Sequence, residues 1–356
     1  MAASFWESTQ RRFWMFSKEE LAQMREKLCE EDPKLVQMYP LPDWKYLYIY
    51  FNQRKDIPFS PRLKECASST RVLLQAQTDN VCIVEINRLG KRLGIRQQII
   101  ATAQIYIKRF YCKVEIRRTN PYLVITTALY LAGKMEECPQ HIRLVATEAR
   151  SLWPDFLSLD TSRLGECEFF LISEMNSQMI VHQPYRTLAT LQSDFYLTQD
   201  EINLSWSIIN DHYVTDLPLL YPPHIVALTA ILLSLVLRPN SMTGAAAANN
   251  IAAAGAALAQ AQVGRGGLGG NNGASSGQTT PGGAGGGPEK DKQQEARFGK
   301  VQRFAAFVAE SQVDIEAMVD CTQEMISFYE VHEQYNDKAT RDQVNRFVKA
   351  RGLDKA

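Results

Sequence analysis

Apolar residues recur at helical spacing through most of this chain, and this pattern restricts what the chain can fold into. They return every three or four positions, which places them on one face of an α-helix. No segment alternates between apolar and polar residues as a half-buried strand does. Capping boxes at Ser17–Glu20 and Thr198–Glu201 mark two helix starts. Asn120 and Pro121 mark a third, as a cap and a first helical residue. We therefore predict an all-α protein.

The expected helices fall into an N-terminal helical arm and two halves of about five helices each. The arm covers residues 1–32, and a proline-rich connection with a possible helix covers 33–78. The first half covers 79–180 and the second covers 181–350. In chain order, the helices of the two halves are expected at 79–93, 97–112, 120–137, 140–152, 161–177, 198–213, 222–237, 296–310, 313–334 and 340–350.

A glycine- and alanine-rich segment, residues 241–288, interrupts the second half. It holds 14 of the 20 glycines and almost no side chain able to build a core. Such a composition does not offset the entropy cost of its own ordering, so we predict a disordered insertion. Within it, Gly264–Gly269 matches the dinucleotide-binding pattern GxGxxG. Because neither the strand before nor the helix after that pattern is expected here, we predict no nucleotide site.

Charge, cysteine content and hydropathy narrow the class of protein. Lys and Arg number 39, as do Asp and Glu, so no net field attracts nucleic acid or an anionic membrane. The seven cysteines form no CxxC pair, and most fall in apolar helical patterns, which favours a reducing compartment. The N-terminus lacks the pattern of a signal peptide. The longest apolar run, 225–237, has 13 residues, whereas a membrane span needs about 20.

The sequence offers no constellation that is typical of an enzyme. Its five histidines stand singly, and it contains no phosphate-binding loop, nucleophile elbow or metal-ligand spacing. We therefore predict no catalytic residue, no cofactor and no metal. Glu136 and Glu137 end a helix, where acids meet the negative end of its dipole, and this weakly favours a binding role.

A basic stretch with aromatic residues, Lys108–Lys113, raises the alternative of nucleic-acid binding. At helical spacing, Phe110 falls on the core face of its helix. We interpret the charged neighbours of Phe110 as a solvated face, since the chain as a whole is not basic.

Several segments resemble the cyclin box. Residues 93–111, LGIRQQIIATAQIYIKRFY, are similar to its second helix and the approach to that helix. Residues 120–137, NPYLVITTALYLAGKMEE, resemble its third helix, with Gly133 where cyclins usually have serine. Residues 163–176, RLGECEFFLISEMN, resemble its fifth helix. The resemblance extends over both halves and implies an all-α fold of two cyclin-box five-helix bundles.

Within the cyclins, the chain resembles the cyclin C family. This likeness is carried by Phe5-Trp6-Glu-Ser, by ECEFFLI, by VHQPYRTL at 181–188 and by NDHYVTDLPLLYPPHIVAL at 210–228. The proline-rich segment 33–61 and the insertion have no counterpart in the compact family pattern. Thr78–Cys82 with Glu85 stands where cell-cycle cyclins have an apolar docking patch, which favours a transcriptional cyclin.

The resemblance implies a surface that binds a cyclin-dependent kinase. Lys134 and Glu168 match the lysine and glutamate with which cyclins hydrogen-bond backbone beside the kinase's regulatory helix. Met135 and Ile172 match apolar neighbours that pack against that helix. Nearby candidates are Glu136, Glu137, Phe169 and Met175. From the residues alone, an alternative stays open: Lys134 complements a helix C-terminus and Glu168 lies on a solvated face.

The function that the resemblance implies is that of a regulatory subunit without catalytic groups. It would bind and activate the Mediator-associated cyclin-dependent kinase and regulate RNA polymerase II transcription in the nucleus, as activator or repressor. Its partners would include other subunits of the Mediator kinase module, but neither nucleic acid nor membrane. The alternative is a DNA- or protein-binding adaptor like transcription factor IIB, although the chain lacks the cysteine pairs of a zinc ribbon.

The N-terminus is unusually rich in aromatic residues for an exposed arm. They are Phe5, Trp6, Phe13, Trp14 and Phe16. We expect them to cover either the chain's own core or the kinase, and the sequence leaves both possibilities open.

Overall fold

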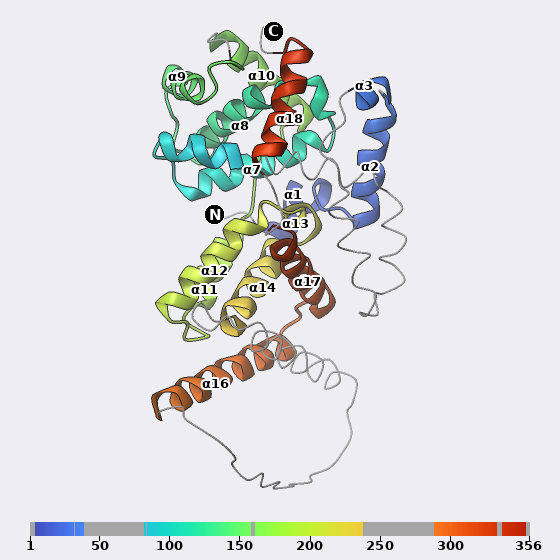
Figure 1. Cartoon of the computed structure of the whole chain (residues 1–356). Helices are drawn as coiled ribbons and strands as arrows, with labels where there is room; N and C mark the ends of the chain where they lie inside the picture. The colour runs from blue at the N-terminus through green and yellow to red at the C-terminus, as the bar shows by residue number, and fades with distance from the viewer. Residues whose placement is uncertain are drawn as a thin grey trace. The chain divides into compact units, whose positions relative to one another are not determined.

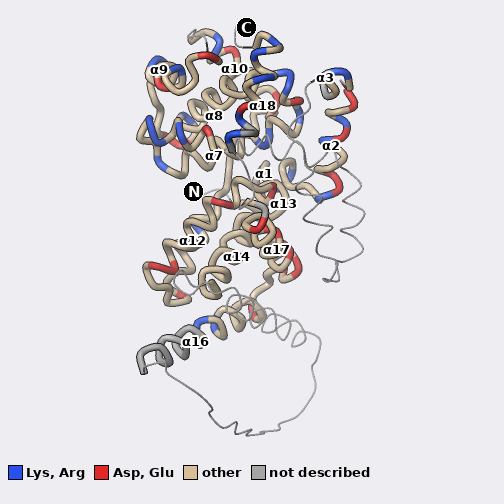
Figure 2. Tube along the Cα trace, viewed as in Figure 1, with Lys and Arg blue, Asp and Glu red and all other residues tan. Residues whose placement is uncertain are grey.

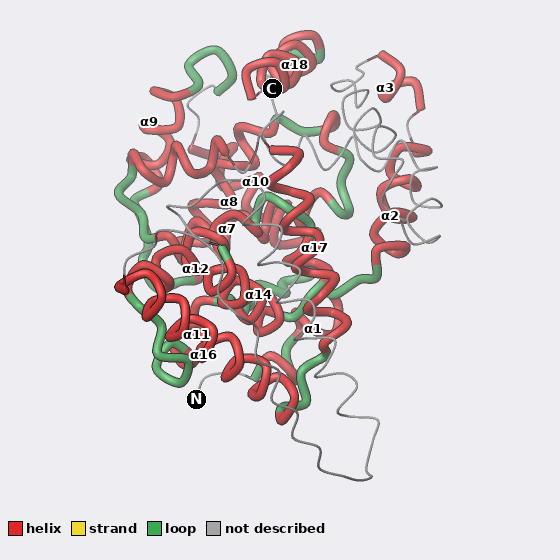
Figure 3. Tube along the Cα trace, turned by 60° about the horizontal axis from the view of Figure 1, so that its bottom comes forward, coloured by secondary structure: helices red, strands yellow, loops and turns green. Residues whose placement is uncertain are grey.

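The computed structural model describes residues 4–31, 33–38, 82, 84–157, 161–237, 288–332 and 337–353. Every regular element among these residues is an α- or 3₁₀-helix, which confirms the all-α prediction (Figure 3). The insertion expected at 241–288 lies outside the described residues except for Pro288, and so does most of the proline-rich connection.

The helices follow the sequence pattern closely (Figure 1). In chain order they are η1 (Phe5–Glu7), α1 (Thr9–Phe13), α2 (Lys18–Glu31), α3 (Pro33–Met38), an unlabelled helix over residues 84–92, α7 (Gln97–Tyr111), η2 (Ile116–Arg118), α8 (Pro121–Met135), α9 (Ile142–Leu152), α10 (Thr161–Glu174), α11 (Tyr185–Leu191), α12 (Gln199–His212), α13 (Leu217–Leu220), α14 (Pro223–Val236), α16 (Pro288–Glu310), α17 (Ile315–His332) and α18 (Asp337–Ala350). Helix α3 was not expected, because its segment was predicted to be irregular.

The chain forms two compact units. The first comprises Met1–Gln183, Asn210–Pro222 and Glu324–Ala356, and the second comprises Pro184–Ile209 and Pro223–Gln323. The division after Gln183 lies close to the expected start of the second half. Helix α18 was expected in the second half, but Val344, Phe347 and Val348 on it are buried in the core of the first unit. Their shared apolar face explains why this side of α18 is buried.

The core of the first unit is built around α7 and α8, against which α10 packs (Figure 1). Helix α7 is buried on all sides from Ile99 to Tyr111, including its polar residues Gln104, Lys108 and Arg109, which marks it as the central helix of the unit. The amphipathic helix α9 covers this centre with Val145, Ala146 and Ala149. The larger core side chains include Tyr106, Phe110, Tyr122, Trp153 and Phe347.

The predicted helix ends are present with the expected hydrogen bonds. The Ser17 backbone N–H donates to the Glu20 carboxylate at 2.8 Å, and the Glu20 N–H donates to Ser17 Oγ at 3.1 Å, which completes a capping box. The side chain of Asn120 accepts from the Tyr122 N–H at 3.1 Å. The helix over 84–92 ends at Gly94, whose φ of 62° lies in the left-handed region that glycine favours.

The core of the second unit contains α14, which carries no charged residue (Figure 2) and is buried from Ile225 to Val236. Phe195 and Phe304 add an aromatic contact to this unit, with ring centroids 5.4 Å apart.

Among the described helices, α14 included, none combines the length and the apolar character that a membrane span requires.

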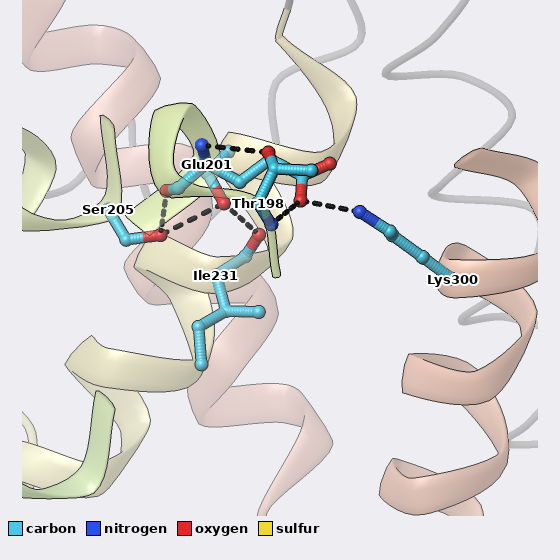
Figure 4. Close-up of polar contacts among 6 residues, drawn as sticks. Thr198, Glu201, Ser205, Ile231 and Lys300 are labelled. Atoms are coloured by element: carbon cyan, nitrogen blue, oxygen red, sulfur yellow. Dashed lines mark hydrogen bonds and ion pairs between the residues drawn. The ribbon is translucent and has the colours of Figure 1, made fainter. Parts of the chain in front are cut away.

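Polar contacts fix the start of α12 in the second unit (Figure 4). The Thr198 N–H donates to Glu201 at 2.7 Å, which confirms the second capping box, and Lys300 Nζ donates to the same carboxylate at 2.7 Å. Burial alone would raise the pKa of Glu201, but the hydrogen bonds from Lys300 and Thr198 outweigh it and lower the pKa.

Candidate protein-binding site on α8 and α10

Lys134 and Glu168 lie together at the surface of the first unit. The last turn of α8 carries Lys134, the middle of α10 carries Glu168, and the two helices pack directly against each other. Lys134 Nζ forms an ion pair with Glu168 Oε1. The Lys134 ammonium also lies 4.7 Å from the ring centroid of Tyr130, which holds it by a cation–π contact. The two predicted residues therefore form one charged site.

Exposed apolar side chains adjoin this ion pair in sequence. Phe169, next to Glu168, is 78% exposed, and Met135, next to Lys134, is 43% exposed. Ile172, one turn along α10, is partly buried against the core. Water around an exposed phenylalanine is unfavourable, and large exposed apolar side chains next to a charged pair in sequence favour a protein contact.

Sequence reasoning missed Phe170, which is 41% exposed. Its ring contacts that of Phe110 edge-on, with the two ring centroids 5.2 Å apart. The doublet Phe169-Phe170 was the available signal, because two adjacent positions of one helix cannot both face the core.

Glu136 and Glu137 follow directly after the end of α8 at Met135, and the backbone there is strained. The Glu136 carboxylate accepts a hydrogen bond of 2.6 Å from Thr102 Oγ1, so this acid is partly engaged within the chain. Glu137 has a φ of 54°, in the left-handed region that costs about 1–2 kcal/mol for a residue with a Cβ. The Cys138 N–H then donates to the Gly133 carbonyl at 2.9 Å, as in a Schellman motif.

No group of histidine, cysteine, aspartate and glutamate side chains in the described part of the chain could hold a metal ion.

Comparisons with known proteins place the chain in a family. Residues 50–180 match the family model "Cyclin, N-terminal domain". The RNA polymerase II holoenzyme cyclin-like subunit of Neurospora crassa is 56% identical over 376 residues, with 100% of both chains covered. The protein of the same description from Aspergillus fumigatus is 48% identical over 355 residues, again with 100% of both chains covered. The chain belongs to the cyclin C family. Its fold is similar to that of a chain in the CAK complex from Chaetomium thermophilum bound to ATP-gamma-S, with a TM-score of 0.52 and 15% identity over 96% of this cyclin and 87% of that chain.

One residue of the predicted site of this cyclin is not at the surface. Met175 is fully buried in the core of the first unit, because α10 has ended and the chain turns inward there. In this position Met175 presents no surface to a partner, and we leave it out of the proposed site. Lys134, Met135, Glu136, Glu137, Glu168, Phe169 and Ile172 all keep exposed or partly exposed side chains.

The basic stretch of this cyclin does not form a solvated face. Phe110 is in the core as expected, but Lys108 and Arg109 are also buried, at 2% and 0% exposure. The interpretation of these two charges as solvated is therefore wrong, and two cations that are buried in this way cannot contact nucleic acid.

The five N-terminal aromatic residues of this cyclin differ in exposure, and Phe5 is partly buried against the His182 ring. Trp14 is buried in the core of the first unit and Phe16 is partly buried against it. Trp6 and Phe13 are more than half exposed. The arm therefore covers its own core with Trp14 and Phe16.

Proposed function

We propose that this cyclin binds and activates a cyclin-dependent kinase of the Mediator complex, and that it does so through the ends of α8 and α10. The observation that carries the proposal is a Lys134–Glu168 ion pair flanked by the exposed side chains of Met135 and Phe169. Membership of a family whose members are described as RNA polymerase II holoenzyme cyclin-like subunits supports a role in transcription. We further propose a nuclear location and contacts with other subunits of the Mediator kinase module.

The proposed mechanism is a shift of the kinase's conformational population. The cyclin surface binds the active placement of the kinase's regulatory helix more tightly than the inactive one. Moving that equilibrium from 1:99 to 99:1 needs a difference of about 5.5 kcal/mol in binding. Burying a Phe or Met side chain contributes about 1.5–3 kcal/mol. The contacts of Phe169 and Met135 reach this size only if both side chains are buried against the active placement and stay exposed against the inactive one.

The cyclin itself supplies no catalytic group in this proposal. Lys134 and Glu168 neutralise each other and would hydrogen-bond the kinase backbone, so they orient a helix and transfer no proton. The acids Glu136 and Glu137 add acceptors at the edge of the same surface.

The test is reconstitution with the purified cyclin-dependent kinase. We expect no phosphorylation of a peptide substrate by the cyclin alone, low activity of the kinase alone, and high activity of the mixture. Phosphorylation by the cyclin alone would contradict the non-catalytic role, and equal activity of the kinase with and without the cyclin would contradict activation. A titration of the cyclin with Mg-ATP should give no heat of binding.

A further inference from the structure

Two cations at the C-terminal end of α7, Arg109 on the helix and Lys113 just beyond it, hold the end of α10 and the segment that follows it. Lys113 Nζ donates a hydrogen bond of 2.7 Å to the carbonyl of Glu174, the last residue of α10. The Arg109 guanidinium donates at 2.7 Å to the carbonyl of Gln178 and at 3.4 Å to that of Ile180. A positive donor suits the Glu174 carbonyl, because the carbonyls at a helix C-terminus lack helical partners and carry the negative end of the dipole. Arg109 instead holds two carbonyls of the segment that follows the helix.

The segment that these cations hold is strained. Asn176 and Ser177 both have positive φ, at 50° and 58°. Two consecutive left-handed residues other than glycine are costly and persist only where the surroundings fix them. The Tyr106 hydroxyl adds a third side-chain anchor by donating to the Met179 carbonyl at 2.7 Å.

Trp14 of the N-terminal arm completes the environment of both cations. Its ring centroid lies 5.1 Å from Arg109 Cζ and 5.1 Å from Lys113 Nζ. Burial lowers the pKa of Arg109 to about 10, so the guanidinium is still charged at neutral pH. A buried cation needs compensating groups, and here the indole face and the backbone carbonyls provide them.

The arm also fastens the far end of the same segment. The His182 N–H donates to Gln10 Oε1 at 2.6 Å, and Gln10 Nε2 donates back to the His182 carbonyl at 3.5 Å. The ring of Phe5 contacts the His182 ring edge-on at 5.9 Å. The segment 174–182 is thus held along its length. Lys113 bonds it at Glu174, α7 bonds it over residues 178–180, and the arm bonds it at His182.

We propose that Lys113 and Arg109, with Trp14 packed against both, are positioning residues for the partner surface on α10. They fix the end of α10 and thereby set where Glu168 and Phe169 lie, although they touch no partner themselves. Phe169 is about 8 Å along the helix from Glu174, so fraying or tilting of this end displaces it. This inference rests on the proposed function, since it assigns the positioning of that same surface.

The test uses variants of the full chain that remove the cation or the aromatic face but keep apolar volume. Lys113→Met and Trp14→Leu should bind the kinase about two- to thirty-fold more weakly, the range of effects for residues coupled to a site without contacting ligand. Hydrogen exchange of the amides at 171–180 should accelerate in both. Lys113→Arg, which keeps the charge, should restore affinity and protection. Leu144→Ala, at a 46% exposed position on α9 of the same unit, is the control and should change neither.

The outcomes separate this inference from the proposed function. Wild-type affinity for a folded Lys113→Met, or an equal loss for Leu144→Ala, overturns the positioning role. A loss of melting temperature without a loss of affinity assigns Lys113 and Trp14 to stability alone and also overturns it. If Glu168→Lys binds as wild type does, the proposed surface itself is wrong and the inference falls with it. If only Glu168→Lys weakens binding, the surface stands and the inference fails.

Discussion

The ammonium of Lys134 and the carboxylate of Glu168 form an ion pair that joins the last turn of α8 to the middle of α10. Lys134 is 39% exposed and Glu168 is 13% exposed, so the pair sits at the edge of the surface. An ammonium has three donors and a carboxylate about four acceptor sites, so each keeps capacity for a further hydrogen bond. The internal ion pair therefore leaves both groups able to hydrogen-bond a further group, as the proposed contact with the kinase backbone requires.

Reversing either charge should weaken kinase binding far more than it weakens the fold. Lys134 is 39% exposed, and an exposed charge contributes at most about 1 kcal/mol to the free energy of unfolding, so Lys134→Glu should fold. Glu168 is only 13% exposed, so Glu168→Lys should lose more stability but still fold. In the complex, losing a desolvated charged partner costs about 2–5 kcal/mol, which weakens binding roughly thirty-fold to several thousand-fold. Circular dichroism measures the fold, and titration with purified kinase measures affinity and activation.

Two further variants make this charge-reversal test sharper. The double variant Lys134→Glu/Glu168→Lys restores the internal ion pair but presents it backwards, and we expect binding to stay weak. The Arg92–Glu148 pair, with N and O 2.9 Å apart and similar exposure, is the control, and Glu148→Lys should leave affinity unchanged. Recovery of binding in the double variant would show that the pair acts only within the chain.

Removing the exposed ring of Phe169 should leave the fold intact and weaken the kinase complex. An exposed side chain contributes little to stability, so Phe169→Ala should change the free energy of unfolding by less than about 0.5 kcal/mol. At the centre of an interface, an aromatic residue contributes about 2–4 kcal/mol, which is roughly thirty-fold to a thousand-fold in affinity. Phe298→Ala on α16, 64% exposed in the second unit, is the control and should bind normally. Equal affinity of the two variants would contradict the site.

Local signals in the sequence predicted the helix ends well. The bonds of Ser17 with Glu20, and of Asn120 with Tyr122, join residues only two or three positions apart, so the residue types alone indicate them. The juxtaposition of Lys134 and Glu168 followed from the resemblance to cyclins and not from spacing. The structure confirms that the two lie together, while their contact with a kinase stays a prediction.

The sequence did not indicate which charges would be buried. The buried Arg109 guanidinium is paired with the backbone carbonyls of Gln178 and Ile180. Because every residue type has a backbone carbonyl, no residue type in the sequence indicates these acceptors. The packing of α18 within the first unit is equally nonlocal. Its residue Arg341 forms an ion pair with the buried carboxylate of Glu85, which lies far away in the sequence. Periodicity predicts a helix and its apolar face, but it does not specify which neighbour that face will meet.

Replacing Glu137 by glycine should stabilise the cyclin. Glycine adopts the left-handed conformation of residue 137 without a Cβ clash and removes an acid from the negative end of α8. Part of this gain is offset by the greater entropy of glycine in the unfolded chain, so we expect about 1 kcal/mol, or a melting temperature higher by about 2–4 °C. Gly94→Ala, which introduces a Cβ at a φ of 62°, should shift the melting temperature in the opposite direction. An unchanged or lower melting temperature for Glu137→Gly would contradict the strain.

Acid should weaken the first unit through Asp216. Arg25 donates two hydrogen bonds of 2.7 Å, one to each carboxylate oxygen of Asp216. Burial alone would raise the pKa of Asp216, but Arg25 and Lys108 lower it from 3.8 to about 2. A carboxyl whose pKa is lower in the folded state stabilises that state above its unfolded pKa and loses this contribution as the pH falls toward its folded pKa. The contribution, about 2 kcal/mol, should be complete above about pH 5 and shrink between pH 4 and pH 2. Urea unfolding at pH 6 and at pH 2.5 measures it when wild type is compared with Asp216→Asn, because Glu201 and other acids titrate in both proteins and cancel in the difference. The gap in the free energy of unfolding should narrow at low pH, and an equal gap at both pH values would show that the charge of Asp216 does not matter.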